Sequence, residues 1–252
     1  DAEDVMTELS LSDKKNVAAA EKAYNALTED QLTFLTEEEH EKMRANSERM
    51  DTLLTGETLI KAAEKAIKSL PADTKIKATD SKKLETAQEA YDKVKNSEDG
   101  LTIDPKLAEK FEASRTAYYA YQQQAENFRS EYLDALPKDA NAVTAEYETA
   151  IPAARTAYKA LSKNVQSFIE KAEVSHLSAC EKTLKKSKSA AVKVDKLIAK
   201  LPADVNAEFT AKDEKAIDAA WKAYDKLTDE QKTFLEDEQH LLDCYNKAYP
   251  EG

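Results

Sequence analysis

Small and apolar residues recur along the chain at the spacing of one helix face, in a phrase written four times. Each copy has an aliphatic residue, two alanines, a tyrosine and a second aliphatic residue. The copies are Val17, Ala20, Ala23, Tyr24 and Leu27; Leu84, Ala87, Ala90, Tyr91 and Val94; Ile151, Ala154, Ala157, Tyr158 and Leu161; and Ile217, Ala220, Ala223, Tyr224 and Leu227. Steps of three and four residues predict four short amphipathic helices. The alanines before the tyrosines are 67, 67 and 66 residues apart, so we predict a repeat protein.

A second phrase, Leu-Thr-x-x-Gln-x-Thr-Phe-Leu, follows the Ala-Tyr helix in the first copy and in the fourth. Thr28 with Gln31, and Thr228 with Gln231, have the spacing of a capping box, so a new helical turn should begin after each threonine. The second repeat departs from this pattern. Residues 95–103 replace the phrase there, and we expect a turn at Asp99-Gly100 followed by a new helix start at Asp104-Pro105.

A third phrase is a long helix that ends at Leu-Pro, at residues 70–71, 136–137 and 201–202. Proline cannot continue a helix and restrains the residue before it, so these are predicted stops. Before two of them a heptad-like seam of about thirty residues predicts a helix of roughly 45 Å. The seams are Leu107, Phe111, Ser114, Tyr118, Tyr121, Ala125, Phe128, Tyr132 and Ala135, and Leu177, Cys180, Leu184, Ser187, Ala191, Val194, Ile198 and Leu201. The stretch before the first stop should kink or break at Thr55-Gly56.

These elements predict an all-α fold of tandem three-helix bundles, spectrin-like, in which neighbouring bundles share long connecting helices and build an elongated rod. The expected repeats overlap because they share these helices. They cover residues 1–70, which lack an upstream long helix; 57–136, with the insertion at 95–103; 123–201; and 190–252, which is truncated.

Composition narrows the chemistry. Only 3 Gly and 6 Pro occur in 252 residues, too few for the turns of a sheet-rich fold. The same shortage argues against Gly-rich phosphate loops and the nucleophile elbow, and 3 His and 2 Cys leave little material for a catalytic centre. We therefore expect no enzymatic activity and no cofactor.

The net charge is −12, from 49 acidic and 37 basic residues. An acidic surface repels phosphate backbones and anionic lipids, so we expect no nucleic-acid partner. No apolar run approaches the roughly 18 residues of a membrane span. The chain opens at Asp1 with neither an initiator Met nor a signal peptide, which favours a segment of a longer protein. We expect a monomer whose partners are neighbouring domains of that parent chain.

The repeated Ile/Leu, Ala, Ala-Tyr, Leu-Thr, Gln and Phe-Leu positions, preceded by a Leu-Pro stop, resemble the small three-helix repeats of large Gram-positive surface and secreted proteins. FIVAR-like modules are the most similar named repeats, and the segment from Leu227 to Lys232 carries the match best. The resemblance implies an extracellular, cell-surface or secreted parent in which such repeats act as spacers or adhesive modules. It brings no catalytic residues.

Three groups of residues are candidate sites. His176 and Cys180, and likewise His240 and Cys244, are four residues apart and could ligate zinc, although inherited repeat packing explains them better. We expect no metal, and no disulfide between the cysteines. Tyr119 lies off the aromatic seam and could serve binding. The third group could bind an anionic ligand or be a solvated helix face. It consists of Lys182, Lys185, Lys186 and Lys188.

Three functions therefore stay open. The first is a non-enzymatic structural spacer or adhesion-associated repeat region of a bacterial cell-surface or secreted protein. The second is a module whose helix faces bind a specific host protein or glycan. The third is an intracellular spectrin-like scaffold. A parent gene with a signal peptide and a wall-sorting tail would favour the first two, and an exposed apolar patch beyond a few hundred Å² would favour specific binding.

Overall fold

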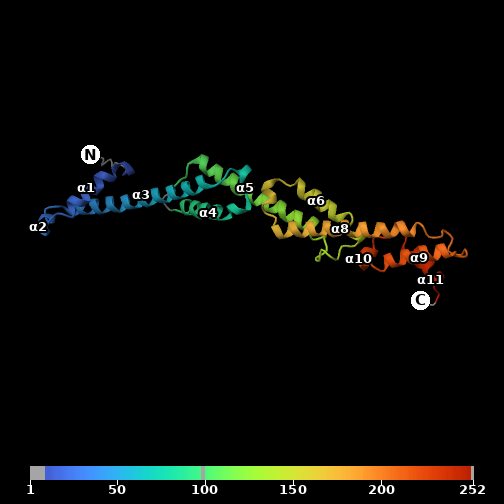
Figure 1. Ribbon diagram of the computed structural model, residues 1–252. Helices are drawn as coiled ribbons and strands as arrows, with labels where there is room; N and C mark the ends of the chain where they lie inside the picture. Colours follow the sequence, from blue (N-terminus) through green and yellow to red (C-terminus); the bar gives the residue numbers. More distant parts are fainter. Residues whose placement is uncertain (1–8, 98–99, 251–252) are drawn as a thin grey trace. The chain divides into compact units, whose positions relative to one another are not determined.

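The computed structural model describes residues 9–97 and 100–250 (Figure 1). Within these residues the chain is helical and forms no strand, which confirms the predicted all-α class. The helices are α1 (Lys14–Tyr24), α2 (Glu29–Leu32), α3 (Glu37–Ser69), α4 (Ser81–Lys95), α5 (Pro105–Phe128), α6 (Ala150–Ala160), α7 (Lys163–Gln166), α8 (Lys171–Ile198), α9 (Ala211–Tyr224), α10 (Asp229–Lys232) and α11 (Glu238–Ala248). None of these helices is long and apolar enough to cross a membrane.

The chain divides into two compact units, residues 1–119 and 120–252, and the division falls within α5. The four repeat boundaries inferred from the sequence stay a prediction. A short turn of 3₁₀-helix precedes α1 at Leu11–Asp13, and others lie between the helices at Asp73–Lys75, Ala78–Asp80 and Ala145–Tyr147.

The four copies of the Ala-Tyr phrase form α1, α4, α6 and α9. Their first aliphatic residues all lie in the interior, from Val17 at 8% exposure to Ile151 and Ile217 at 0%. The predicted capping boxes also form. Thr28 accepts a hydrogen bond from the backbone N–H of Gln31, and Thr228 accepts one from Gln231, each at 3.3 Å. Local sequence thus fixes where α2 and α10 begin.

Helix α3 runs without interruption through Gly56, so the predicted break at Thr55-Gly56 was wrong. Gly56 is buried against the segment that follows α4. A Cβ atom built on Gly56 would lie 2.9 Å from Cδ2 of Leu101, which is closer than side-chain carbons approach one another. The glycine therefore serves close packing within unit 1, despite its cost of about 0.5–1 kcal/mol in helix propensity relative to alanine.

The segment 95–103 departs from the repeat as expected. Gly100 has a φ of +64°, a left-handed conformation that favours glycine, while Asp99 of the expected turn lies outside the described residues. Helix α5 begins at Pro105, as predicted. The backbone N–H of Leu107 bonds the carbonyl of Asp104, which places Asp104 just before the first helical turn.

The leucines of the Leu-Pro stops are buried, with Leu70 at 3% exposure and both Leu136 and Leu201 at 7%. The middle stop differs in detail from the predicted continuous seam. After Phe128 the backbone forms a π-helical turn at Arg129–Leu133, in which the N–H of Asp134 bonds the carbonyl of Arg129 at 2.9 Å. Such a turn inserts one residue into the helical register, so the apolar stripe is re-aimed just before the chain leaves the helix.

Helix α8 belongs to two hydrophobic clusters within unit 2. Its first half contributes Leu177, Cys180 and Leu184 to a cluster with Leu136, Val143 and Ile151. Its second half contributes Val194 and Ile198 to a cluster with Ile217, Leu227 and Leu241, which Leu201 of the Leu-Pro stop after α8 also joins. Ser187, 3% exposed, lies on the same stripe between the two halves. One unbroken helix therefore links two cores.

Candidate functional site

His176 and Cys180 lie together in the first of these two cores, but their hydrogen bonding is that of a packed side chain. Nε2 of His176 is 2.8 Å from the carbonyl oxygen of Pro137. A carbonyl oxygen only accepts, so this ring nitrogen carries the proton and donates it. The bond ties α8 to the Leu-Pro stop of the preceding helix. Sγ of Cys180 is 3.6 Å from the same nitrogen, which is a weak contact.

His240 and Cys244 repeat this arrangement at the start of α11, with Sγ and Nε2 3.9 Å apart. Cys244 belongs to the second core, and Cys180 to the first. Both cysteines are free thiols with 0% exposure. Burial raises the pKa of the Cys180 thiol and of the Cys244 thiol, which opposes formation of the thiolate that binds metals or attacks substrates. Each pair therefore acts as core packing.

No group of three or more His, Cys, Asp and Glu residues in the described part of the chain is arranged to hold a metal ion. His40, the histidine of the first repeat, has a different partner from its counterparts. Its Nδ1 accepts from the hydroxyl of Tyr24, and its Nε2 lies 3.2 Å from the carbonyl of Leu32. In the last repeat, the hydroxyl of Tyr224 donates instead to Glu238 at 2.6 Å.

This tyrosine bond was not anticipated from the sequence. It joins the Ala-Tyr helix to the first turn of the helix after the short turn, in the first and last copies. The bond to the Glu238 carboxylate, together with burial, raises the pKa of Tyr224 to about 12. The repeated tyrosine itself was a signal, because the hydroxyl of a tyrosine on a buried stripe usually has a hydrogen-bond partner.

The lysine face lies on the middle of α8. Lys185 and Lys186 lie one helical turn after Lys182, and all three are exposed, as is Lys188. Carboxylates of the same unit lie close to two of them. Lys188 forms an ion pair with Glu148. Lys186 lines a hollow of about 250 Å³ together with Asp139 and Glu230. The surface that could attract an anion thus centres on Lys182 and Lys185.

Two bidentate ion pairs also join α8 to neighbouring segments. Arg155 on α6 binds Glu181 through Nε and a terminal nitrogen, 2.8 and 2.7 Å from the two carboxylate oxygens. Arg129, in the π turn, binds Glu173 at 2.7 and 3.1 Å. These pairs fix the register of α8 because the planar guanidinium and the carboxylate match in two bonds at once.

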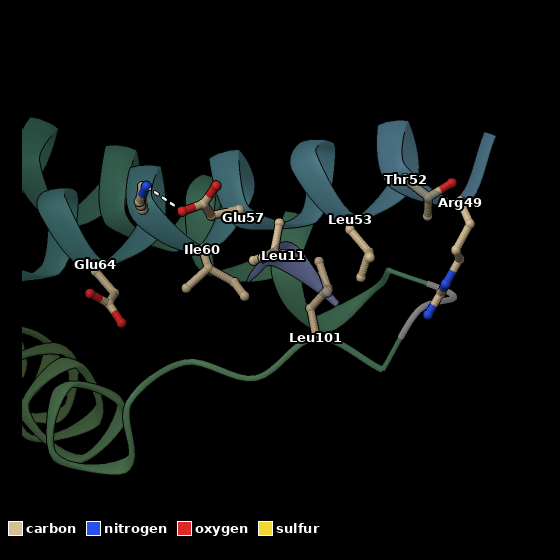
Figure 2. Close-up of a pocket in the computed structure, with 9 residues that line it drawn as sticks. Leu11, Arg49, Thr52, Leu53, Glu57, Ile60, Glu64 and Leu101 are labelled. Carbon is tan, nitrogen blue, oxygen red and sulfur yellow. Dashed lines mark hydrogen bonds and ion pairs between the residues drawn. The ribbon is translucent and has the colours of Figure 1, made fainter. Parts of the chain in front are cut away.

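One hollow in unit 1 was not predicted from the sequence (Figure 2). It has a volume of about 330 Å³ and lies where the turn at Leu11, the middle of α3 and Leu101 meet. Leu11, Leu53 and Ile60 supply apolar side chains, and charged groups stand at the rim (Figure 2). The charged and polar lining residues are Arg49, Thr52, Glu57, Lys61 and Glu64. Gly56 was the signal, because it lets Leu101 approach α3.

This hollow has the size of a small ligand pocket. Its chemistry is that of a packing gap with a charged rim. The hydrogen bond from Lys61 lowers the pKa of Glu57, so this carboxylate stays ionised and faces its own lysine. The described residues of the lining include no Ser, Cys or His that could act as a nucleophile with a neighbouring base. It could hold an aliphatic side chain or a small apolar molecule.

Tyr119, singled out in the sequence, is 59% exposed and makes an edge contact with Tyr118, their ring centroids 5.6 Å apart. Phe34 at the end of α2 is more exposed still, at 85%. It is the most exposed large apolar residue of the part of the chain that the structure describes. No family model, no curated protein and no solved structure matches this chain.

Proposed function

We propose that the chain is a non-enzymatic repeat region, in which successive three-helix bundles share long helices and together form a spectrin-like rod that holds other domains apart. The observation that carries this proposal is the double role of α8. Its first half is buried in the cluster around Ile151, and its second half is buried in the cluster around Ile217.

A helix shared in this way resists bending between two bundles. A hinge at the level of Ser187 would break helical hydrogen bonds and expose side chains on either side, Leu184 at 8% exposure and Ala191 at 0%. Burying one aliphatic side chain stabilises a fold by about 1.5–3 kcal/mol. Bending at Ser187 would lose this stabilisation for each side chain that it exposed. Stiffness of this kind suits a spacer, and independent domains on flexible linkers would lack it.

The setting we propose is the surface of a bacterium or its secreted proteins, as part of a larger adhesive or wall-linked chain. The support is the resemblance of the repeat phrase to FIVAR-like modules, together with an acidic composition that disfavours nucleic-acid partners. Neighbouring domains of the parent chain are the principal partners in this account, and the repeat region itself is monomeric.

Small-angle scattering of the 252-residue chain tests the extended form. A compact domain of this length would have a radius of gyration near ~18 Å. The proposal expects a value well above this and a distance distribution with a long tail. A radius of gyration near that of a compact domain would contradict it.

A second candidate function is binding of an anionic glycan at the lysine face. The observation that favours it is the exposure of Lys182 and Lys185 on adjacent turns of α8. Retention on heparin at low salt, lost in the double variant Lys182→Glu with Lys185→Glu, would support this function. The matched control is Lys188→Glu, which removes a lysine already paired with Glu148. Absence of retention at low salt would exclude it.

A further inference from the structure

The four copies of the Ala-Tyr helix differ in one respect that their sequences do not explain. The first alanine of the phrase has 0% exposure in three copies, at Ala87, Ala154 and Ala220. Its counterpart Ala20 on α1 is exposed. The next alanine behaves alike, because Ala23 is exposed whereas Ala223 is half-buried. The same residue types at the same helical positions are therefore covered in three copies and open in one.

The covered alanines lie against the long helix that precedes each copy. Helix α4 packs on α3, α6 packs on the π turn that continues α5, and α9 packs on α8. Helix α1 packs instead on the long helix that follows it, α3. Alanine allows a close approach of two helices, so an open alanine pair marks a missing helix partner.

Phe34 shows the same difference at the end of the short turn. Its counterpart Phe234 is half-buried and packs on the preceding core, the cluster that contains Leu136 and Val143. Phe168 of the third copy, six residues after Ser162 as Phe34 is six residues after Thr28, is also half-buried against a core. Phe34 is 85% exposed. A large ring that is half-buried against a core in two copies and solvent-exposed in the first indicates an unoccupied docking surface.

The hydrogen bonds of the threonine before this phenylalanine also differ between the first and last copies. The hydroxyl of Thr33 donates to the carbonyl of Asp30, and that of Thr233 donates to the carbonyl of Glu230, both at 2.7 Å. The two threonines therefore have the same local geometry. In the last copy, the oxygen of Thr233 also accepts a hydrogen bond of 2.9 Å from the backbone N–H of Ala145, in the loop of the preceding core. Thr33 presents the same oxygen at an exposed position.

We propose that the face formed by Ala20, Ala23, Thr33 and Phe34 is a docking surface for one further repeat of the same kind, contacting it as α9 and α10 contact the bundle built on α8. The long helix of that repeat covers the two alanines with small and branched residues, the place that Ala190, Val194 and Ile198 of α8 take in the last copy. Its loop holds the phenyl ring of Phe34 and donates a backbone N–H to Thr33.

A second copy of this chain does not meet these requirements. Its α8 is already covered by α9 and α10, and its α3 is covered by α4 (Figure 1). The inference rests on the repeat relation that underlies the proposed function. It does not depend on the spacer role or on the extended form, so scattering can refute those while the docking surface stands.

The test adds the missing repeat. Residues 137–209 are joined ahead of Ser10 of the full chain. The register follows from the capping boxes, in which Ser10 bonds Asp13 at 2.9 Å as Thr210 bonds Asp213 at 2.8 Å. A thiol introduced by Phe34→Cys is alkylated in both proteins. The background alkylation of the buried native cysteines is measured in the same two proteins without this substitution. We expect at least tenfold slower alkylation in the extended protein, which corresponds to about 1.4 kcal/mol of protection.

Tyr119→Cys is the matched control, because Tyr119 is exposed and lies outside the docking surface. Its alkylation rate should be equal in the two proteins. Phe34→Asp gives a second readout. It should leave the urea midpoint of the original chain unchanged and lower that of the extended protein.

Three results would overturn the inference. One is equal alkylation of Phe34→Cys in both proteins while circular dichroism shows that the added helix has folded. Another is an added segment that stays unfolded, because α8 and its loop should fold on this face. The last is a dimer of the original chain in sedimentation that Phe34→Asp abolishes, which would make a second copy the partner.

Discussion

Replacing Ile151 by alanine should destabilise the core around Trp221, although the two residues belong to different hydrophobic clusters. Ile151 has 0% exposure on α6, in the cluster that contains the first half of α8. Truncating a buried isoleucine to alanine costs about 2–5 kcal/mol, from the lost transfer energy and the cavity left behind. If α8 transmits this loss, the second cluster unfolds with the first.

Trp221 is a suitable probe because it is the one tryptophan of the sequence. Its ring stacks on Tyr245, with centroids 3.7 Å apart, in the cluster formed with the second half of α8. Urea unfolding is followed by Trp fluorescence and, in parallel, by far-ultraviolet circular dichroism. With a urea dependence of about 2 kcal/mol/M, a loss of 2–5 kcal/mol lowers the midpoint by about 1–2.5 M. We expect the fluorescence midpoint to fall by this amount together with the dichroism midpoint.

The control separates coupling through α8 from a general loss of stability. Ser189 lies in the middle of α8 and is exposed. Its hydroxyl donates a hydrogen bond to the carbonyl of Lys185 in the same helix. Ser189→Pro removes a helical hydrogen bond between the two cores, at a cost of about 3 kcal/mol or more, and should separate the two transitions. Ser189→Ala should leave them joined. A fluorescence midpoint that Ile151→Ala leaves unchanged would refute the coupling.

Three further outcomes follow from named contacts. Arg155→Lys should lower stability by about 1 kcal/mol in a thermal melt, because lysine cannot form the bidentate bond to Glu181. Tyr224 has a pKa raised from its ordinary 10 to about 12, so its contribution is complete below pH 10 and is lost as pH rises from 10 to 12. Tyr224→Phe should flatten the pH dependence of the urea midpoint in that range, and an unchanged slope would contradict the bond to Glu238. Zinc should not raise the melting temperature of the reduced protein, whereas a rise that Cys180→Ser abolishes would reveal a metal site.

The short helices were predictable because their information is local. The stripe of Ile217, Ala220 and Tyr224 reports one helix face, and the Thr-x-x-Gln spacing at Thr228 reports a helix start. Both depend on neighbours within a few residues along the chain. The ends of α3 and α8 were predictable for the same reason, since a Leu-Pro stop follows each of them closely.

What could not be predicted depends on residues far apart in sequence. Gly56 was interpreted as a helix breaker, but its role is set by Leu101, 45 residues later, which packs where a Cβ atom would be. The π turn at Arg129–Leu133 was hidden because its residues fit an ordinary helical stripe equally well. The exposure of Phe34 was hidden because the residues around it nearly repeat those around the half-buried Phe234. The repeated sequence determines which side chains each copy places on its surface. Whether those side chains are buried depends on the neighbouring helices and loops.

Hydrogen exchange in the middle of α8 tests the shared helix most directly. The amides of residues 185–191 lie between the two cores that α8 serves. If α8 is one rigid element, their protection should be within about tenfold of that at residues 177–184 and 194–198, a difference below about 1.4 kcal/mol. Fast exchange confined to residues 185–191 would show a hinge between two independent bundles and would contradict the account.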